Sequence, residues 1–171
     1  HVQQASRLMA EGDYRAAAIH LKKVLSRSPE HAEARLRLAR IHLGLGDIES
    51  AEKELERAEE LGADVAGLAE LKLRLLAARG EYAQVLASLG MLSDELPGEL
   101  QYELRGTALI GLRNGPAAEE TYRDWLAADP GSAAAAVGLA KALAIQGQVD
   151  EAMNSLRTIV DRDPANADAW L

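Results

Sequence analysis

The stretch that decides the fold is residues 32–65, which read AEARLRLARIHLGLGDIESAEKELERAEELGADV. The first half carries apolar residues at helical spacing, and it predicts a helix over about 34–45. Gly46 then favours a turn, because glycine tolerates the left-handed backbone at a helix end. A second apolar stripe predicts an antiparallel helix over about 49–61, and it consists of Ala51, Leu55, Ala58 and Leu61.

This two-helix unit recurs along the whole chain with a period of about 34 residues, which is the first property to test in any sequence. The turn glycines Gly12, Gly46 and Gly80 are 34 residues apart, and Pro130 and Pro164 have the same spacing. The period divides the chain into repeats that span 1–31, 32–65, 66–98, 99–132 and 133–166, followed by the start of a further repeat at 167–171. We therefore predict one array of five helix pairs.

Small residues fall where the two helices of a pair must approach most closely. They are Ala5, Ala39, Gly106 and Ala140 on the first helices, and Ala17, Ala51, Ala118 and Ala152 on the second helices. A large apolar residue follows each of the latter after four positions, namely Leu21, Leu55, Tyr122 and Leu156. Three positions further on come Val24, Ala58, Trp125 and Ile159. This alternation of small and large side chains predicts the interior of stacked helix pairs.

The third repeat departs from the pattern. Leu73 and Val85 occupy its two small positions, and Lys72 lies where an apolar residue is usual. We expect this helix pair to be rotated or splayed. In the fourth repeat Asn114 and Pro116 flank the turn glycine, which predicts a corner with a different angle.

Composition and charge exclude several classes of function. The net charge is −8, and because no basic cluster is evident we expect no general binding of nucleic acid. The chain has no cysteine, which excludes disulfides and thiolate metal sites. No apolar run reaches the roughly 18 residues that a membrane helix needs, so we expect no direct membrane insertion.

The residues that carry chemistry in enzymes are not arranged for catalysis. The four histidines His1, His20, His31 and His42 lack a metal-ligand spacing, so side-chain packing is the favoured interpretation. Acidic pairs near Pro130 and Pro164 are better explained by helix termination than by a calcium loop. We expect no cofactor, no metal and no enzymatic activity.

The small and large positions together resemble the tetratricopeptide repeat (TPR) family. The second repeat supplies Leu38, Ala39, Ala51, Leu55 and Ala58, and the fifth supplies Leu139, Ala140, Ala152, Leu156 and Pro164. Trp170 stands where a sixth repeat would have its tryptophan. The resemblance implies an all-α, right-handed α-solenoid of five antiparallel helix pairs, and a protein or peptide partner bound on its concave face.

The family's groove positions can be carried over repeat by repeat. They are Leu36, Arg40, Leu43, Glu70, Arg74, Glu103, Thr107, Ile110, Val137 and Lys141. The cations among them suit a partner that carries an acidic group. The alternative is that Arg40 and Arg74 only pair with neighbouring glutamates such as Glu70 or Glu103. The asparagines of the family's carboxylate clamp are missing.

A narrower resemblance concerns residues 12–25 and 51–64, which are similar to the N-terminal repeats of bacterial TPR lipoproteins of the PEP-CTERM protein-sorting system. This implies a lipid-anchor cysteine upstream of His1 and a periplasmic location in the cell envelope, with a cytoplasmic location left open. We interpret the chain as a fragment of a longer array whose apolar ends allow homodimers. Its function is then a non-catalytic interaction scaffold, or alternatively an architectural spacer without a ligand in this segment.

Overall fold

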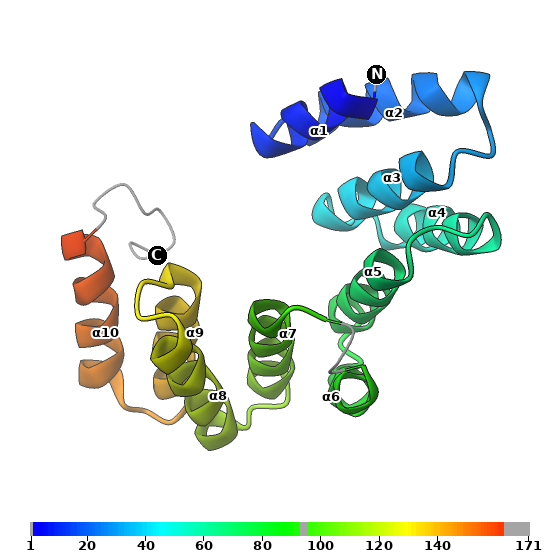
Figure 1. Ribbon diagram of the computed structural model, residues 1–171. Coiled ribbons are helices and arrows are strands. Elements are labelled where there is room, and N and C mark those ends of the chain that lie inside the picture. Colours follow the sequence, from blue (N-terminus) through cyan, green and yellow to red (C-terminus); the bar gives the residue numbers. More distant parts are fainter. Residues whose placement is uncertain (1, 93–95, 163–171) are drawn as a thin grey trace. The chain divides into compact units, whose positions relative to one another are not determined.

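The computed structural model describes residues 2–92 and 96–162 of the chain, with side chains up to residue 157 in the second range (Figure 1). All regular secondary structure in these ranges is helical. The chain divides into two compact units, His1–Arg79 and Gly80–Leu171, which we call unit 1 and unit 2. Each unit is a stack of antiparallel helix pairs, so the predicted all-α fold class is confirmed.

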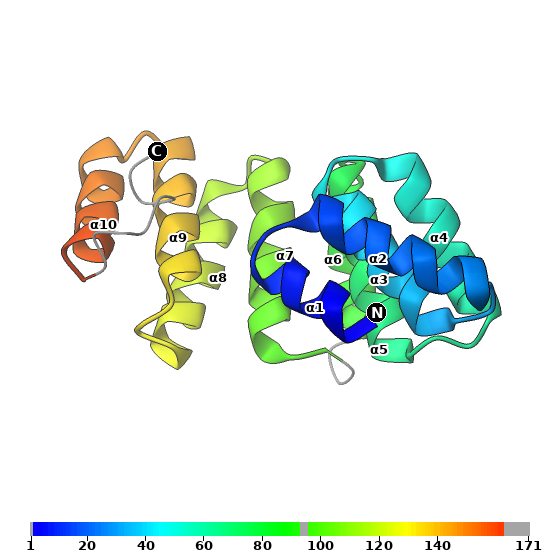
Figure 2. The same ribbon diagram turned by 90° about the horizontal axis from the view of Figure 1, so that it is seen from above.

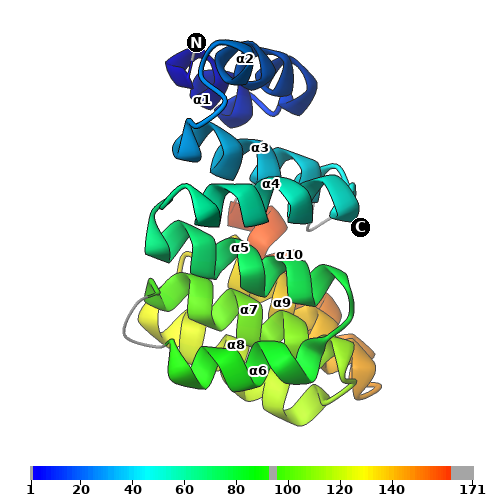
Figure 3. The same cartoon turned by 90° about the vertical axis from the view of Figure 1, so that its right-hand side faces the viewer.

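Unit 1 contains the helices α1 (Val2–Ala10), α2 (Tyr14–Arg27), α3 (Ala32–Gly44), α4 (Ile48–Glu60) and α5 (Val65–Ala78). Each helix packs against the next one in the chain, and α3 also contacts α5. Figure 3 shows α3, α4 and α5 as successive layers. The helices predicted over 34–45 and 49–61 are α3 and α4, displaced by one or two residues.

Unit 2 contains α6 (Tyr82–Met91), α7 (Gly98–Gly111), α8 (Gly115–Ala128), α9 (Ala133–Ile145) and α10 (Val149–Arg162). Here too neighbouring helices pack in chain order, and α7 contacts α9. Figure 2 shows α8, α9 and α10 of this unit side by side. The contact between α7 and α9 brings the first helices of two successive repeats onto one face of unit 2.

The predicted interior positions are buried. All eight small residues are inaccessible, namely Ala5, Ala17, Ala39, Ala51, Gly106, Ala118, Ala140 and Ala152. Leu21, Leu55, Tyr122 and Trp125 are buried beside them, while Leu156 is half-buried. Pro164, Trp170 and the side chain of Ile159 lie outside the described residues. The phase of the repeat is therefore confirmed wherever the structure describes it.

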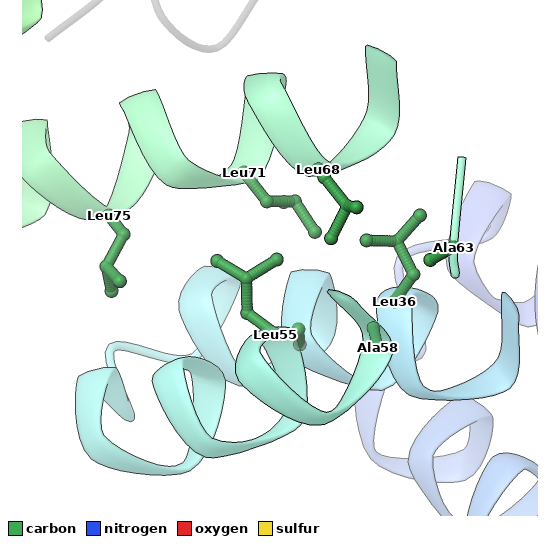
Figure 4. Close-up of a cluster of buried hydrophobic side chains, with 8 residues drawn as sticks. Leu36, Leu55, Ala58, Ala63, Leu68, Leu71 and Leu75 are labelled. Atoms are coloured by element: carbon green, nitrogen blue, oxygen red, sulfur yellow. The ribbon is translucent and has the colours of Figure 1, made fainter. Parts of the chain in front are cut away.

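The core of unit 1 shows how α5 closes the second helix pair. Leu68 and Leu71 of α5 point toward Leu36 of α3 and Leu55 of α4 (Figure 4). Gly67 makes room for this contact, because a β-carbon there would lie 2.8 Å from Leu36 Cδ2. The absence of a side chain at Gly67 therefore leaves the space that Leu36 occupies between α3 and α5.

The turns within the helix pairs repeat one capping geometry. Asp13, Asp47 and Asn114 each accept a hydrogen bond from the backbone N–H three residues on, which stabilises the start of the second helix. Their backbone angles agree within a few degrees, with φ near −85° and ψ between 70° and 77°. In the fourth repeat Arg113 has a left-handed backbone conformation with φ 56°. In the first and second repeats Gly12 and Gly46 have this conformation. The corner predicted to differ thus keeps the common N-cap conformation.

We expect Asp47 to make the stability of the α3–α4 pair sensitive to acid. Hydrogen bonds from Ser50 lower the pKa of the Asp47 carboxyl below its usual value, and His42, 3.0 Å away, lowers it further. A carboxyl with a lowered folded-state pKa contributes stability above its unfolded-state pKa, and this contribution is lost as the pH falls through the folded-state value. Asp47→Asn keeps a capping oxygen and removes the charge.

The measurement is the melting temperature between pH 6 and pH 2 for the parent and for Asp47→Asn. The difference between the two proteins should shrink as the pH falls below about 4, because the Asp47 carboxyl is protonated first in the unfolded parent and at lower pH in the folded parent. A difference that stays constant over the whole range would show that the Asp47 charge contributes nothing to folding.

The third repeat contains the division between the two units, which falls between Arg79 and Gly80. Leu73 and Val85, which replace the usual small residues, are both buried, in unit 1 and unit 2 respectively. Lys72 is exposed and forms an ion pair with Glu59 at 2.6 Å, which explains how a charge is tolerated there. The splaying of this pair and the single five-repeat array both stay predictions.

Candidate functional site

A pocket of about 380 Å³ opens between α7, α8 and α9 of unit 2. All five groove positions predicted in this unit line it, namely Glu103, Thr107, Ile110, Val137 and Lys141. The remaining lining residues are Tyr122, Trp125, Ala133, Ala134 and Gly138. The structure therefore brings the predicted residues of two repeats together at one concave site, whose volume lies at the lower end of the range for ligand pockets.

Tyr122 occupies the floor of this pocket between two glycines. A β-carbon at Gly106 on α7 would lie 2.3 Å from Tyr122 Cζ, and one at Gly138 on α9 would lie 2.1 Å from Tyr122 Cε1. No real side chain approaches a ring so closely, so both glycines are needed to admit the tyrosine. The pocket floor is thus formed by the Tyr122 side chain of α8, which extends between α7 and α9 at two glycine positions.

Stacked aromatic rings support the floor from below. Trp125 stacks with Tyr122 at a ring-centroid distance of 6.3 Å and with Tyr102 at 6.2 Å. Such offset pairs each stabilise by about 0.5–1.5 kcal/mol beyond the area that they bury. Trp125 is 3% exposed, so its main role is packing, as predicted, and it also contributes to the pocket lining.

The polar groups of the pocket are positioned around the Tyr122 hydroxyl. Burial raises the pKa of the Tyr122 phenol above its ordinary value, a hydrogen bond with Thr107 lowers it, and the charge of Glu103 raises it again. The phenol is therefore neutral at physiological pH and offers one donor and one acceptor. A ligand group that enters here meets two hydroxyls, one carboxylate and one ammonium.

Lys141 provides the positive charge at the rim of the pocket. Its side chain is exposed and forms no ion pair with a residue in the described part of the chain. The apolar part of the lining includes Ile110 on α7 and Val137, four residues before Lys141 on α9, and both are half-buried. A lysine ammonium beside an apolar wall attracts a carboxylate that is carried next to an aliphatic group.

The groove positions of unit 1 differ, because their cations are already paired. Glu70 accepts from Arg40 Nη2 at 2.8 Å and from Arg74 Nε at 3.0 Å. Arg37, one residue from the predicted groove position 36, pairs with Glu33 at 2.6 Å and also donates to Ser6 Oγ. The structure thus shows the pairing that was the alternative interpretation of Arg40 and Arg74.

The apolar groove positions of unit 1 lie in the core. Leu36 is only 5% exposed and packs in the cluster with Leu68 and Leu71, while Leu43 is half-buried against the same cluster. A pocket of about 320 Å³ is lined by Ser6, Met9, Glu33, Leu36, Arg37 and Arg40. Leu36 offers little surface there, because the approach of α5 covers it. The groove residues of unit 1 are consequently more occupied by contacts within the unit than the groove residues of unit 2.

Two histidines of the described ranges, His31 and His42, have local structural roles. His31 accepts from the Ala34 N–H at 3.2 Å and thereby caps α3, and His42 pairs with Asp47. Within the described part of the chain, no three or more histidine, aspartate or glutamate residues are grouped so that they could hold a metal ion. No helix there combines the length and the apolar character that crossing a membrane requires.

Sequence reasoning missed two features of the unit 2 pocket. It favoured packing for Tyr122 and Trp125, and both residues also line the pocket. It gave no role to Gly138, because only Gly106 falls on the repeat position reserved for small residues. The coincidence of a tyrosine in the fourth repeat with glycines on both flanking first helices was the available signal.

These features define the chain as a helical-repeat scaffold with a small concave pocket, the class that the spacing of its small residues predicts. The sequence pattern of the Tetratricopeptide repeat family matches residues 8–75 and 109–171, which is more than half of the chain. The chain therefore belongs to the tetratricopeptide repeat family, whose members are protein–protein interaction scaffolds and are generally not enzymes.

One curated relative is the human Tetratricopeptide repeat protein 34, which is 40% identical over 63 residues. The match covers 37% of this chain and only 11% of the length of that relative. It therefore indicates shared repeats, and it carries no information on the activity of the longer protein.

Solved structures of other repeat proteins have a similar fold. TTC0263, a thermophilic TPR protein from Thermus thermophilus, has a TM-score of 0.82 at 21% identity, with 99% of this chain and 93% of that chain covered. PilW, a type IV pilus biogenesis factor, has a TM-score of 0.77 at 23% identity, with 98% and 79% covered. YrrB, described as a TPR protein with an unusual peptide-binding site, has a TM-score of 0.60 at 18% identity, with 99% and 88% covered. At these identities the likeness establishes the fold alone.

Proposed function

We propose that the unit 2 pocket binds a peptide segment or partner helix that presents a carboxylate beside an aliphatic side chain. The observation that carries this proposal is Lys141, an exposed ammonium without a carboxylate partner among the described residues, in a pocket that Ile110 and Val137 also line. The aliphatic group contacts Ile110 and Val137, and the carboxylate pairs with Lys141. The rigid helices on both sides lower the entropic cost of binding, because little has to be ordered.

The contrast with unit 1 supports this choice of site. Arg40 and Arg74 share the carboxylate of Glu70, so a ligand carboxylate there would have to displace an existing ion pair. At Lys141 the ligand supplies the first carboxylate instead. Of the three equivalent cations, Lys141 is therefore the one whose charge is available to a partner.

The experiment is a selection of random displayed peptides on the immobilised chain, followed by affinity measurements with the synthesised winners. We expect enriched peptides to carry an aspartate or glutamate next to leucine, isoleucine or valine. Lys141→Glu should weaken their binding at least about tenfold, since it replaces an attractive charge by a repulsive one. Lys141→Gln should lie between this variant and the parent.

The matched control is Lys53→Glu, which makes the same charge change on an exposed residue of α4 in unit 1. It should leave the affinity unchanged. Equal binding to the parent and to Lys141→Glu would refute the proposal. A selection without any enriched sequence would favour the second candidate, an architectural spacer, for which Glu70 with Arg40 and Arg74 is the supporting observation, since this network ties α3 to α5 without a ligand.

We also propose the wider setting that the narrower sequence resemblance implies, namely a lipid-anchored protein on the periplasmic side of a bacterial envelope that acts in exopolysaccharide-linked protein sorting or envelope assembly. It rests on residues 12–25 and 51–64, whereas the matches reported above carry only the family. The test is fractionation of cells that produce the full-length protein. Recovery in the cytoplasmic fraction without any lipid modification would refute this setting.

A further inference from the structure

The outer face of α2 is a concentration of positive charge in an acidic protein. Residues 14–29 contain four cations and no carboxylate, although the whole chain has a net charge of −8. The cations are Arg15, Lys22, Lys23 and Arg27, and together with Ile19 we call them the basic stripe. The net charge of the whole chain does not reveal this local concentration of cations.

All members of the basic stripe are available to a partner. Arg15, Lys22, Lys23 and Arg27 are exposed and form no ion pair within the described part of the chain. Ile19 is 68% exposed, although an isoleucine is among the residue types most often buried. Elsewhere in unit 1 exposed arginines and lysines commonly have carboxylate partners, such as Arg7 with Glu11 and Lys72 with Glu59.

Helix geometry makes these residues one continuous surface. With a rotation of about 100° per residue, Arg15, Ile19, Lys22 and Lys23 fall within an arc of about 100°, and Arg27 lies about 40° beyond it. Ile19 lies within this arc, flanked by cations. Arg15 and Arg27 are 12 residues apart, so the stripe is about 18 Å long. The opposite face of α2 packs through Ala17 and Leu21 against its neighbours in unit 1.

The corresponding face of α4 shows that this pattern is not a general property of second helices. Lys53 and Arg57 lie on it among Glu49, Glu56 and Glu60, and Arg57 pairs with Glu60 at 2.6 Å. That face is therefore largely self-neutralised. The exposed face of α2 has the same position in its repeat as this face of α4, but it carries no carboxylate.

We propose that the basic stripe of α2 is a second interaction surface, which binds an acidic segment of a partner protein. The segment places carboxylates opposite Arg15, Lys22 and Lys23 and one aliphatic side chain against Ile19. The basic stripe is a different site from the unit 2 pocket, because it lies on the exposed face of α2 in unit 1. It binds several carboxylates, whereas the pocket binds one.

The ends of the stripe favour a short segment over an anionic membrane. Glu11 and Asp13 precede α2, and Glu30 follows it. A lipid surface presents negative charge along its whole extent and would meet these carboxylates too. A peptide about 18 Å long places its charges only along the stripe. Charge complementarity of limited length therefore identifies a protein segment.

The test is a fluorescence-polarisation titration of the chain with a labelled helical peptide about 14 residues long, in which glutamates flank one leucine. Lys22→Glu with Lys23→Glu should weaken binding about tenfold, since two attractive charges become repulsive. Ile19→Ser should weaken it about threefold through the lost apolar contact. All three residues are exposed, so the melting temperature should not change.

The matched control is Lys53→Glu with Arg57→Glu, which changes the net charge by the same amount on the outer face of α4. We expect it to leave the affinity unchanged. Equal weakening by the two double variants would overturn the proposal, because the peptide would then sense only the overall charge. Tighter, α2-dependent binding to vesicles of phosphatidylcholine with phosphatidylserine, or to duplex DNA, would overturn the assignment of a protein partner.

Discussion

Replacing Ala51 by arginine is expected to unfold the α3–α4 helix pair. Ala51 is 3% exposed at the contact between the two helices, so the new side chain has neither space nor water around its charge. Overpacking and an unpaired buried charge together should destabilise unit 1 by more than about 4 kcal/mol. Circular dichroism should show a large fall in the melting temperature, and amide NMR signals of both helices should be lost.

The control for this variant is Ala66→Arg, which adds the same side chain at an exposed position of α5 in the same unit. It should melt within a few degrees of the parent, since surface substitutions usually change stability by less than about 0.5 kcal/mol. If Ala51→Arg also melted like the parent, the assignment of the small residues to the interface between helices would be wrong.

The second large effect is expected at Gly138, where a single methyl group should both destabilise unit 2 and distort its pocket. The β-carbon of Gly138→Ala would lie 2.1 Å from Tyr122 Cε1, and the buried ring has Gly106 on its other side. Overpacking of this kind costs about 1–3 kcal/mol, which exceeds the gain in helix propensity of up to about 1 kcal/mol.

Gly90→Ala provides the comparison. Gly90 lies near the end of α6, and a β-carbon there meets nothing within 4 Å. This variant should be neutral or slightly stabilising, because only the propensity term remains. Unfolding curves in urea for the two variants measure the difference directly. A Gly138→Ala protein as stable as Gly90→Ala would mean that Tyr122 moves without cost and that the pocket floor is not rigid.

The helix pairs were predictable because the same spacing of small and large apolar residues recurs from repeat to repeat. A single occurrence of Ala51 and Leu55 at helical spacing is weak evidence, whereas four occurrences in phase leave few other arrangements. The aspartates after Gly12 and Gly46 recur in the same way, and the structure shows that both cap a second helix. The fourth corner was harder, because a left-handed Arg113 in place of glycine depends on the turn as a whole.

The site was predictable in position and only partly in its properties. The repeat register placed Thr107 and Lys141 on one face, and the structure brings them together. It did not reveal that Glu70 neutralises Arg40 and Arg74, because all three types of side chain occur on binding and on solvated faces alike. The pairing of Arg40 with Glu70 depends on the spacing between α3 and α5, which the register of one helix does not contain, whereas Arg74 pairs with Glu70 within α5. The space between Gly106 and Gly138 that Tyr122 fills was not predictable either, because it also depends on the spacing between helices.

The central claim is that the unit 2 pocket holds a segment of a protein partner, and site-specific photocrosslinking in cells that produce the full-length protein tests it most directly. A photoreactive residue at Ala134 or Val137, both on the pocket lining, should form an adduct with another polypeptide, and the adduct should disappear when Lys141→Glu is added. The same residue at Glu120, an exposed position of α8 outside the pocket lining, should form none. Adducts that persist with Lys141→Glu, or that arise from Glu120 and from neither pocket position, would contradict the claim.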